Sequence, residues 1–563
     1  MTSPTTVSEA VADVVAQHSD TLFSLMGNGN AHFVSSLTSR GHRVVNVRHE
    51  TATVIAAQSY FLATGKIPAA STTYGAGYTN MLTSLAEARL ARIPMVVVVG
   101  APPTTGPRGQ DIDQVGAARA LYVHTLVASP RNAPQVTRHA YEVAVRDRVP
   151  VIVSLPYDVV DSPVDNSEDG AAAPTAQEVL REEELQEAPP VGEDDAAAVA
   201  EALARAERPL ILAGRGSVLS GAGPVLREIG DRVGALFATS LMAHRIFESP
   251  WDIGIAGGFS SPRAAKLIDR ADVVLAVGAS LNLYQMRYNK LVAGAHTVIQ
   301  IDTRANATHE QVTSYHRADA RDFAEAVLKH LPEDSKSDWR STVTCPSLGD
   351  QRTYEDFGPD GRLDPRAVMD RFESMLPAPR TITQDTGHFM GWAARHLTAP
   401  DPQGMLLPGL ALQSIGLGVG SALGIAVGRE DRLPVLVTGD GGLAMELNEL
   451  DTLVREVKSA LVIVLNDAAY GMEVHQYGVR GLDTTAMVFD ELDFARIATA
   501  VGAQGAKIRT VEDLERVRSW IASGAEGVFV ADVAISADVV ADWLDMSNAY
   551  YASTSEATLG APR

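Results

Sequence analysis

The sequence is poor in cysteine, in basic clusters and in long apolar runs. Cys345 is the only cysteine among 563 residues, so no disulfide can form within the chain, which suits a reducing compartment. The 47 basic residues are outnumbered by 69 acidic ones, and no basic cluster offers a face for nucleic acid or an anionic membrane. No apolar run approaches the ~18 residues of a membrane helix, and the N-terminus lacks a signal-peptide pattern. We therefore expect a cytoplasmic protein that binds neither nucleic acid nor membrane.

Short, β-branched apolar runs alternate with helix-like stretches in three successive blocks. This alternation predicts three doubly wound α/β domains with mostly parallel sheets. Two stretches without β-like runs, one of them acidic and rich in Ala and Pro, separate the blocks and are typical of linkers. The expected parts are a first domain (1–165), a linker (166–192), a central domain (193–335), a linker (336–362), a third domain (363–545) and a C-terminal tail (546–563).

The strongest site signal is the motif GDGG at 439–442, which follows a predicted strand and opens a predicted helix. Glycines let backbone approach a ligand closely, and a helix N-terminus favours phosphate. The next predicted strand ends at Asn466-Asp467, and Asp467 is 27 residues after Asp440. In a βαβ unit of ~30 residues both would lie at one sheet edge, where their oxygens suit a divalent cation. Each segment alone is more often a helix cap or a turn, but the pair is more specific.

The pattern GDG…LND resembles the metal-binding motif of the thiamine diphosphate enzymes of the acetolactate synthase, pyruvate oxidase and 2-oxo acid decarboxylase type, in which GDG is followed by NN. The resemblance implies that Asp440 is a magnesium ligand and that the backbone carbonyl of Ala469 is another. Asp467 stands where the family usually has Asn, which keeps an oxygen ligand and adds a charge. Asn466 stays open as the alternative to Asp467.

A glutamate early in the first domain extends the resemblance. The family carries it shortly after a strand, and "VVNVRHETATVIAAQ" places Glu50 there. In the family this carboxyl group bonds the pyrimidine ring of the cofactor and promotes removal of the thiazolium proton. Alone, Glu50 would be an ordinary acid in the first turn of a helix. Together with the GDG motif, it is better interpreted as catalytic.

Three further stretches match the family. "TYGAGYTN" resembles its glycine-rich turn, "QSIGLGVGSALGIAVG" contains the apolar residue that bends the cofactor (Ile415), and Gly387-His388 matches a turn at the diphosphate. Alone, Ile415 would be read as core and His388 as a surface turn. The cofactor-binding residues implied by the resemblance are Glu50, Gly75, Gly77, Gly387, His388, Gln413, Ile415, Gly439, Asp440, Gly441, Gly442, Asp467, Ala469, Tyr470, Gly471 and Met472.

The resemblance covers nearly the whole chain and assigns its domains in order as pyrimidine-binding, central and diphosphate-binding. Because the first and third domains of the family supply different halves of one site, it implies a homodimer or homotetramer with active sites between subunits. Thiamine diphosphate and Mg²⁺ are the implied cofactors. Some relatives bind FAD in the central domain, but "LAGRGSV" and "VGASLNLYQMR" lack a full G-x-G-x-x-G, so FAD is not favoured.

The reaction is less defined than the cofactor. The resemblance implies a small 2-oxo acid or other carbonyl substrate, whose decarboxylation leaves an enamine. No His-His pair of the pyruvate decarboxylase type occurs at 106–116, where Gln110 lies in a stretch similar to the acetolactate synthase FQE, and Thr73 stands where benzoylformate decarboxylases have His. Glu473, past the metal turn, is an acidic candidate, although exposed helical acids are common.

We take Glu50, Glu473 and Gln110 as the catalytic candidates. With few proton donors in the first domain, addition of the enamine to a second carbonyl is favoured over its protonation. The sequence thus predicts a lyase or transferase similar to acetolactate synthase, acting as a carboligase. The alternatives are a simple 2-oxo acid decarboxylase, a C–C hydrolase or acyltransferase of the same family and, remotely, a non-catalytic binding protein on this fold.

Overall fold

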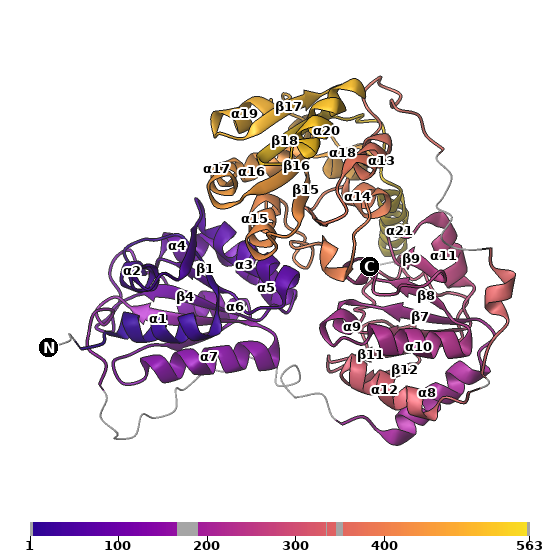
Figure 1. Ribbon diagram of the computed structural model, residues 1–563, viewed down its shortest axis with the longest axis horizontal. Helices are drawn as coiled ribbons and strands as arrows, with labels where there is room; N and C mark the ends of the chain where they lie inside the picture. Colours follow the sequence, from indigo (N-terminus) through magenta and orange to yellow (C-terminus); the bar gives the residue numbers. More distant parts are fainter. Residues whose placement is uncertain (1–3, 166–189, 334, 345–352, 560–563) are drawn as a thin grey trace.

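The computed structural model describes residues 4–165, 190–333, 335–344 and 353–559. Most of the first expected linker and Cys345 therefore lie outside the described residues. The described chain forms three six-stranded sheets in which all paired strands are parallel, with helices flanking each sheet (Figure 1). The predicted fold class, three doubly wound α/β units, is confirmed. No helix among the described residues is long and apolar enough to cross a membrane.

The first sheet is built around buried valine-rich strands. Its elements are α1 (Val7–His18), β1 (Thr21–Ser24), α2 (Ala31–Ser39), β2 (Arg43–Asn46), α3 (Glu50–Thr64), β3 (Ala69–Thr72), α4 (Ala76–Asn80), α5 (Leu82–Leu90), β4 (Met95–Ala101), α6 (Gln114–Ala120), β5 (His124–Val127), α7 (Ala133–Asp147) and β6 (Pro150–Pro156). The strand order is β2-β1-β3-β4-β6-β5. Helix α3 begins at Glu50 because the ring of His49, its N-cap, accepts the Thr51 N–H. That start places the Glu50 carboxyl just beyond the end of β2.

The central sheet has the order β12-β11-β10-β7-β8-β9, so the chain reverses its winding direction between β10 and β7. The carboxyl ends of strands at such a switch point form a crevice that commonly binds ligands. The elements are α8 (Glu193–Arg205), β7 (Pro209–Ala213), α9 (Arg215–Leu219), α10 (Gly223–Val233), β8 (Leu236–Thr239), η2 (Leu241–Ala243), β9 (Asp252–Ile255), α11 (Pro262–Asp269), β10 (Val273–Val277), β11 (Thr297–Asp302), β12 (Ser314–Arg317), α12 (Ala320–His330) and η3 (Trp339–Thr342).

The third sheet brings the two aspartate-bearing strand ends side by side. Its elements are α13 (Pro365–Met375), β13 (Arg380–Gln384), α14 (Met390–His396), η4 (Pro402–Gly404), β14 (Met405–Leu406), α15 (Gly418–Gly428), β15 (Leu433–Gly439), α16 (Asp440–Met445), α17 (Leu447–Glu456), β16 (Ser459–Asn466), α18 (Gly471–Tyr477), η5 (Gly478–Arg480), η6 (Thr485–Met487), α19 (Phe494–Ala500), β17 (Gln504–Ile508), η7 (Glu512–Leu514), α20 (Glu515–Ala522), β18 (Gly527–Ala534) and α21 (Asp542–Leu559). The order is β14-β13-β15-β16-β18-β17. Gly439 pairs with Leu465, so β15 and β16 end at the same edge.

The first and third domains pack through helices α3 and α15. Gly424 has no side chain where an added Cβ would lie 2.0 Å from the Ala56 carbonyl oxygen, and a Cβ at Gly420 would lie 2.6 Å from the Ile55 side chain. The glycines of the "SIGLGVGSALGIAVG" stretch therefore let the two helices approach closely. This packing sets the helix that starts at Glu50 against the helix that follows the Ile415 turn.

The C-terminal helix α21 lies between the third and central domains (Figure 1). Trp543, near its start, packs edge-to-face against Phe259 and Tyr284 of the central domain. Tyr550 stacks on Tyr288, with ring centroids 4.9 Å apart. The tail expected from residue 546 thus begins inside a helix that starts at Asp542.

Candidate active site

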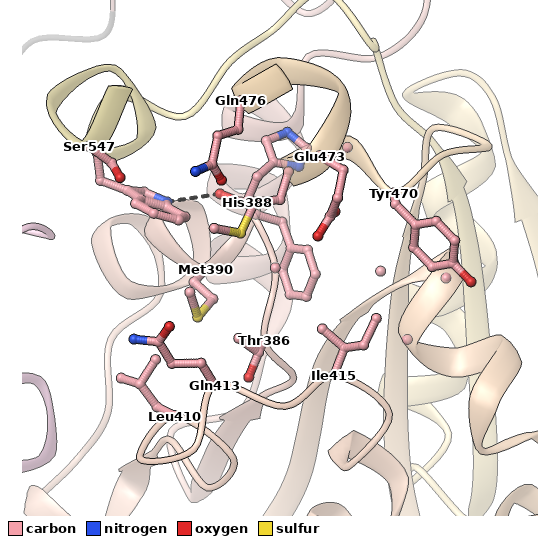
Figure 2. A pocket seen from close by; sticks show the side chains of 18 of the residues that line it. Thr386, His388, Met390, Leu410, Gln413, Ile415, Tyr470, Glu473, Gln476 and Ser547 are labelled. Carbon is pink, nitrogen blue, oxygen red and sulfur yellow. Dashed lines mark hydrogen bonds between the residues drawn. The ribbon is translucent and has the colours of Figure 1, made fainter. Parts of the chain in front are cut away.

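A cavity of about 690 Å³ lies at the carboxyl edge of the third sheet. Its walls come from the ends of β13, β15 and β16, from the 410–415 turn, from the central domain and from α21 (Figure 2). All the third-domain residues that the sequence predicts as site residues line it: Gly387, His388, Gln413, Ile415, Gly439, Asp440, Gly441, Gly442, Asp467, Ala469, Tyr470, Gly471, Met472 and Glu473.

Asp440 and Asp467 form a pair of acids in the cavity wall. Asp440 is buried, and its two oxygens accept the N–H groups of Gly441 (2.8 Å) and Ala468 (2.7 Å). Removal from water raises the pKa of both carboxyl groups, and the charge of Asp440 raises that of Asp467 further. Neither makes an ion pair within the described chain. Two adjacent acids without a cation are unfavourable, and a divalent cation would neutralise both.

The donor set at this pair is small. Within the described residues no three His, Cys, Asp or Glu side chains cluster as metal ligands. Two carboxylates and a backbone carbonyl would fill only part of the coordination sphere of a Mg²⁺ ion. Oxygens of a phosphate or of water would fill the remaining positions, as is usual for this ion. The residues present therefore fit a Mg²⁺ ion that is shared with a diphosphate.

The glycines of the GDGG turn are required by its surroundings. A Cβ at Gly441 would lie 2.7 Å from the Tyr470 ring, and one at Gly442 would lie 2.3 Å from an Asp385 oxygen. No other residue would fit at either position without a shift of its neighbours. The absence of side chains also leaves the backbone beside Asp440 open to the cavity.

Two buried acids that sequence reasoning missed hold the 409–417 turn. Asp385 accepts the N–H groups of Gly416 (3.0 Å) and Leu417 (3.4 Å), and burial raises its pKa to about 6. Glu87 of α5 accepts the N–H groups of Gly409 (3.0 Å) and Leu412 (2.6 Å). The turn so held directs Ile415 into the cavity (Figure 2).

His388 is buried at the cavity wall and its Nε2 atom has no hydrogen-bond partner. Burial lowers its pKa to about 3, with a further contribution from His475, so the ring is neutral at pH 7. Its carbonyl oxygen accepts the Trp543 indole N–H at 2.9 Å (Figure 2). An orphaned buried ring nitrogen that lines a cavity fits a polar ligand atom.

The predicted residues of the first domain form a separate group, because Glu50, Gly75, Gly77 and Gln110 do not line this cavity. Glu50 is buried and accepts the amide N–H of Asn80 at 2.9 Å, a partner that sequence reasoning missed. An added Cβ at Gly77 would lie 2.7 Å from the Thr73 methyl group and 2.9 Å from a Glu50 oxygen, so a side chain there would displace Thr73 or the Glu50 carboxyl.

Gln110 is exposed on a loop that a stacked arginine holds in place. The Arg108 guanidinium lies 4.5 Å from the centre of the Tyr74 ring and 4.7 Å from that of Tyr157. It also donates to both oxygens of Asp111. These contacts order the loop beside the glycine turn of the first domain, where the Gln110 carbonyl lies 3.6 Å from a Cβ added at Gly75.

The two glycine turns of the central domain, considered above as a flavin signal, pack against each other. A Cβ at Gly214 would lie 2.2 Å from the Gly278 carbonyl oxygen, and one at Gly216 would lie 2.7 Å from the Gly278 Cα. This close approach at the switch point accounts for the glycines without a dinucleotide.

Comparison with known proteins identifies the family. Three family models match in order: "Thiamine pyrophosphate enzyme, N-terminal TPP binding domain" at residues 5–117, its central domain at 196–327 and its C-terminal TPP binding domain at 385–533. The chain belongs to the thiamine pyrophosphate enzyme family. The suspected family and the assignment as a thiamine diphosphate-dependent lyase or transferase are confirmed, and thiamine diphosphate (the same compound) is its cofactor.

Relatives of this thiamine pyrophosphate enzyme include synthases and decarboxylases. It is 26% identical to the acetolactate synthase isozyme 2 large subunit of Escherichia coli (strain K12), over 92% of this chain and 93% of that protein. It is 26% identical to the probable 2-ketoarginine decarboxylase AruI of Pseudomonas aeruginosa, over 91% of each. The thiamine diphosphate-dependent 4-hydroxybenzoylformate decarboxylase of Rhodococcus jostii RHA1 shares its fold, with a TM-score of 0.77, 19% identity, and coverage of 94% of this chain and 99% of that one.

Proposed function

We propose that this enzyme uses thiamine diphosphate and Mg²⁺ to cleave a 2-oxo acid and to join the remaining carbon unit to a second carbonyl compound, as a carboligase. The observation that carries the cofactor assignment is the pair of acids Asp440 and Asp467 at the cavity wall, beside a glycine turn. Neither acid makes an ion pair with a described residue. Ile415 and the orphaned ring nitrogen of His388 line the same cavity.

Each residue group has a distinct part in this proposal. Asp440, Asp467 and the Ala469 carbonyl would hold Mg²⁺, with Gly387, His388 and Gly441 around the diphosphate. Ile415 would support the bend between the two rings, and the Glu50 carboxyl would hold a proton at the pyrimidine nitrogen. When bound, the cofactor supplies a carbon nucleophile and an electron sink next to the substrate carbonyl. The residues of the chain bind the cofactor, orient the substrate and exclude water from the site.

We further propose that the active site forms between two copies of the chain, in a homodimer or homotetramer. Glu50 and its neighbours do not line the cavity that contains Asp440, so the first domain of another copy would complete it. The segment after the metal turn exposes large apolar side chains: Val479 is 73% exposed, Leu482 52% and Val488 51%. Three exposed apolar side chains within ten residues are suited to burial in a subunit interface.

Carboligation is favoured over simple decarboxylation by the titration of His388, which lines the cavity, and of His475, whose ring lies beside it. A decarboxylase must deliver a proton to the carbon that loses CO₂. Burial lowers the pKa of His388 to about 3 and also lowers that of His475, so neither is protonated at pH 7. Addition to a second carbonyl does not need a fast proton donor at that carbon.

Simple decarboxylation is the second candidate, and Glu473 is the observation that favours it. This exposed carboxyl lines the cavity and could relay a proton from solvent. The relative AruI is described as a probable decarboxylase.

Product analysis separates the two candidates. The enzyme with thiamine diphosphate and Mg²⁺ is incubated with pyruvate and other 2-oxo acids, with and without aldehyde acceptors, and CO₂ and organic products are identified by mass spectrometry. We expect CO₂ together with a hydroxyketone or acetohydroxy acid, and the same products from Glu473→Gln. Aldehyde as the sole product, lost in Glu473→Gln, would establish the decarboxylase instead.

Replacing Asp467 by Asn, the usual family residue, should stabilise the cofactor-free protein by roughly 1–2 kcal/mol at pH 8, because it removes an acid whose ionised form is disfavoured by burial and by the charge of Asp440. When folding raises the pKa of an acid, the folded state is favoured most at pH values below the acid's ordinary pKa. This contribution to the free energy of unfolding is lost as the pH rises through the raised pKa. The Tm of the wild type should therefore fall between pH 5 and pH 8 by more than the Tm of Asp467→Asn. Equal pH slopes would contradict the assignment of Asp467 as the member of the pair whose pKa is raised further, by burial and by the charge of Asp440.

A further inference from the structure

The two oxygens of the Glu50 carboxyl group have different surroundings. The Oε2 atom accepts an N–H of the Asn80 amide at 2.9 Å. The Oε1 atom makes no hydrogen bond with any described residue. It lies on the side of Gly77, where an added Cβ would be 2.9 Å away, so the missing side chain leaves room beside this oxygen. The protein itself thus distinguishes the two oxygens.

Asn80 is held in place by the helix that carries Glu50. It is the last residue of α4, and its carbonyl oxygen accepts the hydroxyl of Thr51 at 2.6 Å. Thr51 follows Glu50 in the first turn of α3. Two hydrogen bonds therefore join the end of α4 to the start of α3, one through the backbone of Asn80 and one through its side chain. Together they keep the Asn80 amide directed at Glu50.

A buried clamp fixes α4 from its other side. The Tyr78 hydroxyl donates to the Gln114 carbonyl oxygen at 2.8 Å, and Tyr78 is only 1% exposed. The Gln114 side chain accepts the Gly75 N–H at 3.2 Å and donates to the Gly100 carbonyl oxygen at 2.9 Å. Burial raises the pKa of Tyr78, so its hydroxyl stays a donor at neutral pH. The clamp ties the turn before α4 to α6 and to the end of β4.

We propose that Asn80 is the positioning residue of the Glu50 carboxyl group, and that the clamp of Tyr78 and Gln114 holds Asn80 for this task. The inference rests on the proposed function, in which Glu50 holds a proton at the cofactor. A protonated carboxyl group has one O–H donor, and its other oxygen can only accept. Because the Asn80 N–H occupies Oε2, the proton is carried by Oε1, on the open side beside Gly77. Without Asn80 the two oxygens would be equivalent, and the orientation of the acid would be lost.

A purely structural role for these contacts makes a different prediction. If Asn80 and Tyr78 only held α4 in the domain, their replacement would lower the Tm and the cofactor affinity and leave the kcat of the loaded enzyme unchanged. If they position Glu50, kcat falls while the Kd of the cofactor stays near that of the wild type. Replacing Asn80 should then cost nothing further once Glu50 has been replaced.

The test compares Asn80→Ala and Tyr78→Phe with the full-length wild type, each saturated with thiamine diphosphate and Mg²⁺. Tyr141→Phe is the matched control for Tyr78→Phe. Tyr141 is a second buried tyrosine of the first domain, its hydroxyl bonds to that of Ser19 at 2.7 Å, and it packs in a separate cluster of core side chains. Glu50→Gln and the double variant Glu50→Gln/Asn80→Ala complete the set.

Four quantities are measured for each variant. They are the Tm, the Kd of the cofactor by calorimetry, the near-ultraviolet circular dichroism of the bound cofactor, and kcat and KM with the substrates that the wild type turns over. The Kd and the dichroism report on the Glu50 site independently of turnover.

We expect Asn80→Ala to lower kcat by roughly 10–100-fold and Tyr78→Phe by roughly three- to tenfold, with the Kd of the cofactor within about threefold of the wild type. Tyr141→Phe should lower the Tm as much as Tyr78→Phe does and keep the wild-type kcat. The dichroism of the cofactor bound to Asn80→Ala should change in the same direction as in Glu50→Gln. The double variant should match Glu50→Gln.

A wild-type kcat and dichroism spectrum in Asn80→Ala would overturn the inference and leave the proposed function in place. A loss of cofactor affinity as large as the loss of kcat would overturn it too, because it would show that Asn80 only holds the fold. A wild type that binds no thiamine diphosphate, or a fully active Glu50→Gln, would overturn the proposed function and this inference with it. If Tyr78→Phe does not fold, Asn80→Ala alone decides the outcome.

Discussion

Asp440→Ala should abolish Mg²⁺-dependent binding of thiamine diphosphate, raising its Kd by more than about 100-fold. The replacement removes one metal ligand and leaves Asp467 without its partner at the cavity wall. It also removes the acceptor of the Gly441 and Ala468 N–H groups, which shapes the turn. Calorimetric titration of the cofactor, with Mg²⁺ and again with EDTA, measures the effect.

Asp431→Ala is the control for this experiment. Asp431 is an exposed aspartate of the same domain, paired with Arg429 and remote from the cavity lining. We expect wild-type cofactor affinity from it, and a wild-type protein that loses the cofactor in EDTA. Normal cofactor binding by Asp440→Ala would show that the metal lies elsewhere.

Glu50→Gln should keep cofactor affinity and lose activity by roughly 10²–10⁴-fold, the range for removal of a general acid or base. Glutamine preserves the size of the side chain and can still accept the Asn80 N–H, so the fold around α3 should persist. It cannot hold the proton that the pyrimidine nitrogen requires. Circular dichroism of the bound cofactor and CO₂ release over a panel of 2-oxo acids separate binding from turnover.

The replacement Glu142→Gln, on the exposed face of α7, controls for loss of an acid in the same domain. It should match the wild type in both binding and turnover. Activity of Glu50→Gln equal to that of the wild type would remove Glu50 from the mechanism. If neither the wild type nor Glu50→Gln turns over any substrate of the panel, the result would favour a binding protein on this fold.

Long apolar strands and local motifs were readable from the sequence. The runs that became β4, β15 and β16 are buried along nearly their whole length, and such runs signal the centre of a parallel sheet. The spacing of Asp440 and Asp467 then followed from one βαβ unit. Short strands such as β3 and the two-residue β14 carry too few residues for a pattern, and they form because longer neighbours pair with them.

The supporting acids could not be predicted, because their partners are distant in sequence. Glu87 holds N–H groups more than 300 residues away, and Glu449 accepts the Arg48 N–H next to the α3 start. The helix predicted to begin at the GDGG motif is divided at Glu446 into α16 and α17, and the Glu446 carboxylate accepts the Val419 N–H. Nothing local in the sequence marks these residues as different from other helical acids.

The shared site between subunits is tested most directly by a mixed dimer that carries Glu50→Gln in one copy and Asp440→Ala in the other. If each site joins the first domain of one copy to the third domain of the other, one site of the mixed dimer carries both replacements and the other carries none. The purified mixed dimer should then show about half of the wild-type activity, while both parent variants are inactive. An inactive mixed dimer would contradict the account, because it would mean that Glu50 and Asp440 act within the same chain.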